Sequence, residues 1–186
     1  MRRKQPAGVE PLSPHRKWRA ITLATLVLVP AYWSMLAGLV AAADDGDSGP
    51  HPGAAIALGL TLIPFVFIVL AFLSEHPRAP GAVLRAMGLT LLVGIPVSAI
   101  AGDAVTGIVA GVGAGGVVAL RADGPHNARA RAWAVLVAVA YTFFLVRGAS
   151  ALALLPAPIF PFTAIGIADH LSERRQERDG SSVGPA

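Results

Sequence analysis

The sequence contains no cysteine, and only 14% of its 186 residues are charged. The lack of cysteine excludes disulfides, iron–sulfur clusters, thiolate zinc sites and catalysis by a thiol nucleophile. A soluble domain carries about a quarter charged residues, whereas here the few charges leave long stretches almost free of them. This distribution predicts an all-α integral membrane protein.

Apolar stretches make up most of the chain, and they cover residues 20–43, 54–73, 86–120 and 132–168. About 20 apolar residues cross the hydrocarbon core as a helix, so each of the first two stretches fits one crossing. The last two stretches are too long for one crossing, and each is interrupted by a charge beside a glycine, at Gly102-Asp103 and Arg147-Gly148. We therefore predict six spans, at approximately 20–43, 54–73, 84–101, 104–120, 131–147 and 150–169.

The distribution of basic residues favours six spans over four. Cytoplasmic loops carry an excess of Lys and Arg, and a six-span arrangement puts 14 of the 15 basic residues on that side, with only Arg147 outside. A four-span arrangement would instead bury Arg147 in the middle of a span, at a cost of at least ~2.5 kcal/mol. We predict a six-span helical bundle of three antiparallel hairpins, with the N and C termini both cytoplasmic.

This arrangement divides the chain into one membrane domain and two short tails. Residues 1–19 form a basic cytoplasmic tail, residues 20–170 form the six-helix domain, and residues 171–186 form a charged, disordered cytoplasmic tail. Domains below about 40 residues rarely fold unaided, so we expect neither tail to form a soluble domain.

The fourth predicted span carries the most distinctive local pattern, with glycines four residues apart at Gly107, Gly111 and Gly115. Glycines at this spacing share one helix face and allow another helix to approach closely. The sequence leaves open whether that helix belongs to the same chain or to another subunit. The letters G-x-G-x-x-G also occur here, ending at Gly116, but the motif lacks the preceding strand and the later carboxylate of a dinucleotide site. We expect no bound cofactor.

Two charged residues are predicted to lie near the outer face. Asp103 precedes the fourth span, where it caps the helix or contacts an ion or substrate. Arg147 lies at a similar depth, where it anchors the interface, pairs with Asp103 or binds a lipid phosphate. All five histidines fall in loops, tails or span ends, which disfavours haem ligation.

Prolines interrupt several spans. Pro30, Pro64 and Pro96 lie near the middle of the first three, where each removes a backbone hydrogen bond and kinks its helix. The sixth span carries a proline cluster at Pro156, Pro158 and Pro161. Irregular backbone in a membrane persists only where protein or water satisfies it. The cluster therefore predicts a kinked packing helix or, alternatively, a broken helix that lines a small cavity.

No Asp, Glu, Lys, Arg or His falls in the middle of any predicted span. Ion-coupled pumps and transporters usually need one there, and the spans also lack a metal-binding or nucleophile–base pair. We expect a non-enzymatic accessory, assembly or stabilising subunit of a membrane complex. The alternative is a transporter or channel for a small or apolar solute, which the prolines favour.

The expected partners follow from charge and packing. The basic inner loops would lie on anionic lipid headgroups, and a protein subunit would bind through the glycine face of the fourth span. The net charge of +4 follows from membrane topology, so we expect no nucleic acid partner. The preference for arginine over lysine, with abundant alanine, glycine and proline, is typical of a GC-rich bacterial genome. We therefore predict a multi-pass protein of the inner membrane.

Overall fold

The structure is a computed structural model that describes residues 12–43, 52–102 and 104–121, together with short stretches between residues 132 and 174. The first three ranges contain four helices, α1 (Pro14–Ala43), α2 (Pro52–Leu73), α3 (Ala79–Ala101) and α4 (Ala104–Ala119). The described residues form helices and turns, with no strand among them. The first three helices are long and apolar enough to cross a membrane, and α4 is a shorter apolar helix. The predicted all-helical class is therefore confirmed for the described part of the chain.

Three of the helices begin earlier than the predicted spans, α2 by only two residues, at Pro52. α1 begins at Pro14, so its first turns include the basic residues that the sequence assigned to the tail. α3 begins at Ala79, with a proline in its first turn, where the missing N–H is harmless. Apolar runs mark the part of a helix inside the hydrocarbon core, whereas the hydrogen-bonded helix extends beyond it. α3 ends at Gly102, whose φ of 70° forms a left-handed cap and whose N–H donates to the Ser98 carbonyl at 2.9 Å.

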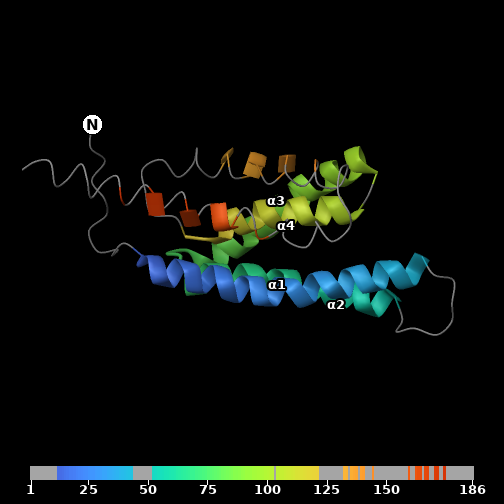
Figure 1. Cartoon of the computed structure of the whole chain (residues 1–186), viewed down its shortest axis with the longest axis horizontal. Coiled ribbons are helices and arrows are strands. Elements are labelled where there is room, and N and C mark those ends of the chain that lie inside the picture. Colours follow the sequence, from blue (N-terminus) through green and yellow to red (C-terminus); the bar gives the residue numbers. More distant parts are fainter. Residues whose placement is uncertain are drawn as a thin grey trace, which may run out of the picture.

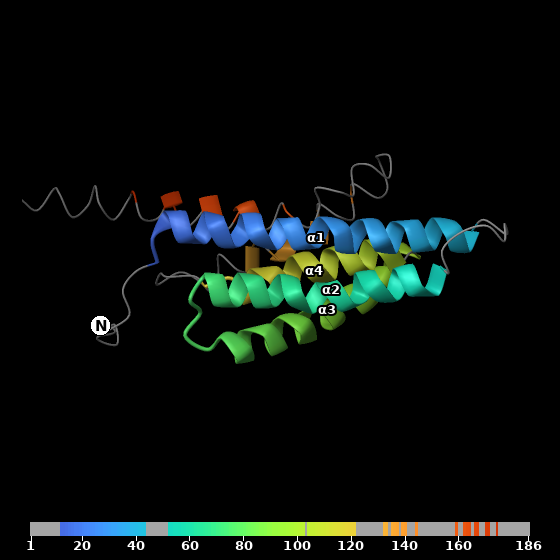
Figure 2. The same cartoon turned by 90° about the horizontal axis from the view of Figure 1, so that it is seen from below.

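The four helices lie along the long axis of the molecule (Figure 1). α1 packs along α2, and α3 packs along α4, while α2 makes smaller contacts with both α3 and α4. Consecutive helices run in opposite directions, as Figure 2 shows from below. The start of α1, the loop between α2 and α3, and the end of α4 therefore lie at the same end of the bundle.

α4 is the most buried of the four helices, and 12 of its 16 residues are buried. The other three helices have large apolar side chains on their outer faces, and Leu26, Phe65 and Leu92 are each more than half exposed. A soluble monomer rarely exposes so much apolar surface, whereas a membrane helix presents it to lipid. The described bundle thus has the surface of a membrane protein.

Parts of the C-terminal region join this core. Phe162 is fully buried, and its ring lies against Gly116 of α4, where a β carbon would overlap it. A β carbon on Gly166 would lie 3.1 Å from Ile21 Cδ1 and 3.3 Å from Trp18 Cη2 of α1. The predicted spans 131–147 and 150–169 fall largely outside the described residues.

Candidate functional site

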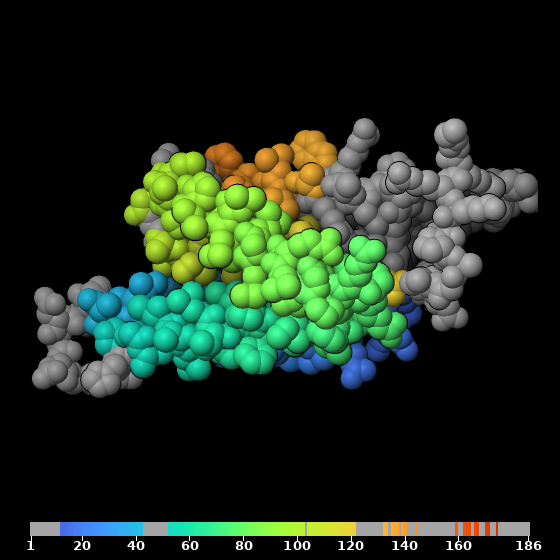
Figure 3. Space-filling model, turned by 180° about the vertical axis from the view of Figure 1, so that it is seen from behind, coloured from blue at the N-terminus to red at the C-terminus, as the bar shows by residue number. Residues whose placement is uncertain are grey.

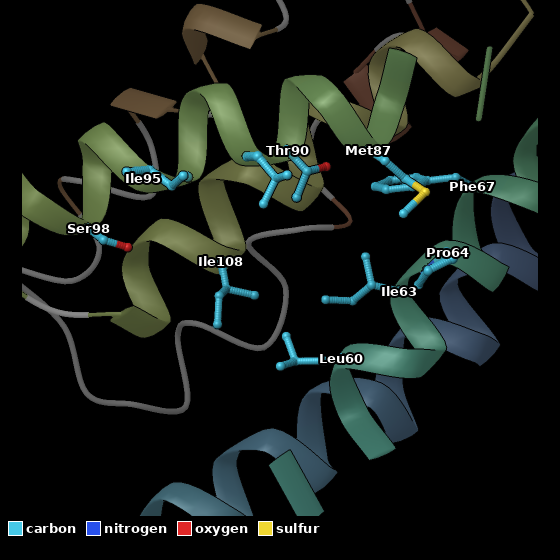
Figure 4. Close-up of a pocket in the computed structure, with 11 residues that line it drawn as sticks. Leu60, Ile63, Pro64, Phe67, Met87, Thr90, Ile95, Ser98 and Ile108 are labelled. Atoms are coloured by element: carbon cyan, nitrogen blue, oxygen red, sulfur yellow. The ribbon is translucent and has the colours of Figure 1, made fainter. Parts of the chain in front are cut away.

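A groove of about 360 Å³ lies between α2 and α3, with α4 behind it (Figure 4). The α2 wall contains Leu60, Ile63, Pro64 and Phe67, which share one helix face. The α3 wall likewise uses one helix face, and α4 contributes a single side chain: the lining residues are Met87, Thr90, Leu91, Gly94, Ile95, Ser98 and Ile108. None of the lining residues carries a charge.

The groove exists because α2 and α3 diverge. Near their connecting loop the two helices meet through small side chains, those of Ala71, Ala79 and Ala82. Farther from the loop, larger residues line the space between them, and Figure 3 shows the far end of α3 lying apart from α2. In Figure 4, Ile63 extends from α2 and Ile108 from α4 into this space. Leu91 and Ile95 are more than 60% exposed, so the groove opens on the outer surface of the bundle.

The groove contains a few polar groups among its apolar side chains. The Thr90 hydroxyl donates to the Ala86 carbonyl at 2.8 Å, which leaves lone pairs of its oxygen available to accept. Ser98 places a second hydroxyl on the same wall. On the opposite wall, Pro64 has no N–H, so the Leu60 carbonyl lacks the donor that residue i+4 normally supplies in a helix.

Behind the groove, the predicted glycines of α4 lie against α3 of the same chain. A β carbon on Gly107 would lie 2.8 Å from Ser98 Cβ and would overlap the Ser98 hydroxyl. A β carbon on Gly111 would overlap the Thr90 carbonyl oxygen, and one on Gly115 would lie 2.7 Å from the Ala86 carbonyl oxygen. These three glycines therefore form a row that allows the backbones of α3 and α4 to approach each other closely.

A second polar arrangement joins three segments at the loop end of the bundle. The Arg121 backbone N–H donates to Ser74 Oγ at 3.0 Å, and its guanidinium donates to the Glu75 carbonyl at 3.3 Å. Glu75 adopts a positive φ of 50° in this loop, and its side chain pairs with Arg16 of α1. Arg121 is 5% exposed, whereas both side chains of the Arg16–Glu75 pair are more than half exposed. These contacts tie the start of α1, the α2–α3 loop and the end of α4 together.

The remaining predicted site residues, Asp103 and Arg147, lie outside the described residues. Among the residues that the structure does describe, no group of three or more His, Asp or Glu side chains is placed to hold a metal ion. The groove has no motif of its own in the sequence. Its one available signal was Pro64, because a proline within a span frees a carbonyl on the neighbouring turn.

Comparison with known proteins adds no assignment, since the chain matches no protein-family profile, no curated protein and no solved structure.

Proposed function

We propose that the chain is a six-span protein of the bacterial inner membrane, with both termini in the cytoplasm. The distribution of charge within the described bundle supports this orientation. The segments that meet at the loop end carry the following basic residues: Arg16, Lys17, Arg19, Arg78, Arg85 and Arg121. Cytoplasmic segments have such an excess. Four of these residues, Arg16, Arg19, Arg78 and Arg85, are exposed, and anionic headgroups attract each such cation by about 1 kcal/mol.

Within that membrane, the proposed role is that of a non-enzymatic accessory, assembly or stabilising subunit of a larger complex. The observation that carries this role is the extensive burial of α4 and the close packing of its glycines against α3. Such backbone-to-backbone contact favours a structural role over conduction. Since the glycine row faces α3, a partner subunit would contact an outward face, such as the α1 face that bears Leu26, Trp33 and Val40 at seven-residue spacing.

The test is affinity purification of the tagged full-length chain from its native membrane in a mild detergent, followed by mass spectrometry. The proposal predicts one stoichiometric membrane partner. In the reciprocal experiment, purification of the tagged partner should recover this chain. Trp33→Ala should reduce that recovery, whereas Gly88→Ala should not, because a β carbon at Gly88 meets nothing within 4 Å. Purification of the chain alone would contradict the role of a subunit.

A second candidate function is the passage of a small apolar solute, and the groove beside Pro64 is the observation that favours it. Stopped-flow uptake of indole into vesicles separates the two candidates. Faster uptake with the protein than without it, reduced by Pro64→Ala, would support transport. Equal uptake in both kinds of vesicle would contradict it.

A further inference from the structure

We propose that the groove between α2 and α3 binds a neutral, mostly apolar ligand that carries one hydrogen-bond donor, and that the donor is directed at the Leu60 carbonyl. The site is a property of the described helices and holds whether the chain serves as a subunit or moves a solute. Four features support it: the size of the groove, its lining, the proline in its α2 wall and its opening.

The size of the groove selects a small molecule over a helix. Ligand pockets occupy roughly 300–1,000 Å³, and the groove, at about 360 Å³, lies at the lower end of that range. A transmembrane helix is about 10–12 Å across and rises 5.4 Å per turn. A single turn with its side chains therefore exceeds the groove, and the bulky side chains of Leu60 and Met87 keep a partner backbone at a distance.

The lining selects a neutral ligand. The walls are formed by aliphatic, aromatic and thioether side chains, with two hydroxyls and no charged group. A charged ligand would lose its hydration without gaining a counter-ion, which is costly in an apolar site. An uncharged, apolar ligand can replace the lipid that contacts these side chains at little cost in free energy.

The carbonyl of Leu60 favours a ligand that carries a hydrogen-bond donor. Pro64 removes the N–H that would otherwise occupy this carbonyl, and both residues line the groove. A backbone carbonyl without a donor is unfavourable in hydrocarbon, where water is scarce. A ligand N–H or O–H at this point satisfies the carbonyl, whereas an alkane or an acyl chain does not.

The opening gives the ligand a route through the membrane. Leu60, Leu91 and Ile95 are all at least 45% exposed on the outer surface of the bundle. A ligand that partitions into the bilayer therefore reaches the groove laterally, without passing the buried α4.

Two methionines of the chain allow a direct test. Met87 lines the groove, whereas Met35 of α1 is buried against Gly59 of α2. The full-length protein, labelled with ¹³C at the methionine methyls and held in phosphatidylcholine nanodiscs, is titrated with indole. Indene, which has the same shape but no N–H, is titrated in parallel. The proposal predicts a saturable shift of the Met87 signal with indole, a stationary Met35 signal, and binding of indene about three- to tenfold weaker.

Two pairs of variants identify the groups responsible. Pro64→Ala restores the N–H that occupies the Leu60 carbonyl, so it should weaken indole binding about three- to tenfold and leave indene binding unchanged. Pro96→Ala, the matched control, removes an exposed proline of α3 that does not line the groove and should change neither. Leu60→Trp should fill the groove and abolish both shifts, whereas Leu58→Trp, at an exposed position outside the groove, should abolish neither.

Four results would overturn the proposal. A Met87 shift that grows linearly with indole without saturation would indicate partition into lipid only. Equal binding of indole and indene, or equal effects of Pro64→Ala and Pro96→Ala, would show that the carbonyl takes no part. A Met87 signal that broadens with protein concentration and does not shift with indole would indicate that a second copy of the chain covers the groove.

Discussion

Gly94 of α3 and Gly107 of α4 face each other so closely that a β carbon on Gly94 would lie 3.0 Å from the Gly107 carbonyl oxygen. The contact is nearly backbone on backbone. Here α3 packs along α4 through backbone, while it makes only smaller contacts with α2. The small residues between α3 and α4 therefore account for the close approach of these two helices.

Gly111→Leu should destabilise the protein, because even a β carbon at this position overlaps the Thr90 carbonyl oxygen. Overpacking a core costs about 1–3 kcal/mol and occasionally more, and the obstacle here is backbone that cannot rotate away. We expect a loss of about 3 kcal/mol in the free energy of unfolding, measured by SDS titration in mixed micelles. Gly88→Leu is the control, since nothing lies within 4 Å of its added β carbon. Equal stability of the two variants would contradict the close approach of α3 and α4.

Gly116 and Phe162 should show strong energetic coupling. Gly116→Ala places a methyl group where the Phe162 ring lies, and Phe162→Ala removes a fully buried ring. We expect losses of about 1–3 kcal/mol and 3–5 kcal/mol, respectively. In the double variant the new methyl occupies part of the vacated space, so the loss should fall short of the sum by about 0.5–3 kcal/mol. Strictly additive losses would mean that the two residues do not touch.

Ser74→Ala and Glu75→Gln should differ in effect although they are neighbours. Ser74→Ala leaves the Arg121 backbone N–H without its acceptor in a buried position, at a cost of about 1–3 kcal/mol. Glu75→Gln weakens only an exposed pair with Arg16, worth about 0–1 kcal/mol, and keeps the carbonyl that accepts from Arg121. Thermal unfolding of both variants in the same detergent compares them. A larger loss for Glu75→Gln would reverse the order that the burial of these groups implies.

The sequence predicted the helical class and the ends of the described helices better than their beginnings. Turn residues mark the ends clearly, and Gly102 ends α3 where the sequence placed the end of the third span. α1 and α3 begin six and five residues before the predicted spans, because basic residues and prolines continue the helix beyond the apolar run. Hydropathy indicates which part of a helix is surrounded by lipid. The helix itself continues as far as its backbone hydrogen bonds.

The site depends on contacts that the sequence does not encode locally. Glycine spacing predicted a face for close packing, but it could not say that Thr90 and Ser98 lie opposite that face. The groove depends on the angle between α2 and α3, which is set by alanines near one loop and bulky residues farther away. The contact between Arg121 and Ser74 joins residues 47 positions apart, and neither has a motif that indicates the other.

The orientation of the bundle in the membrane can be tested directly with single cysteines, because the chain has none of its own. Gly53 is exposed at the start of α2, with open space around an added β carbon, and Pro77 is an exposed, uncharged residue of the α2–α3 loop. Gly53→Cys should react with a membrane-impermeant maleimide on intact bacterial cells. Pro77→Cys should react only after the cells are permeabilised. Labelling of Pro77→Cys on intact cells, with Gly53→Cys protected, would invert the orientation and contradict the account.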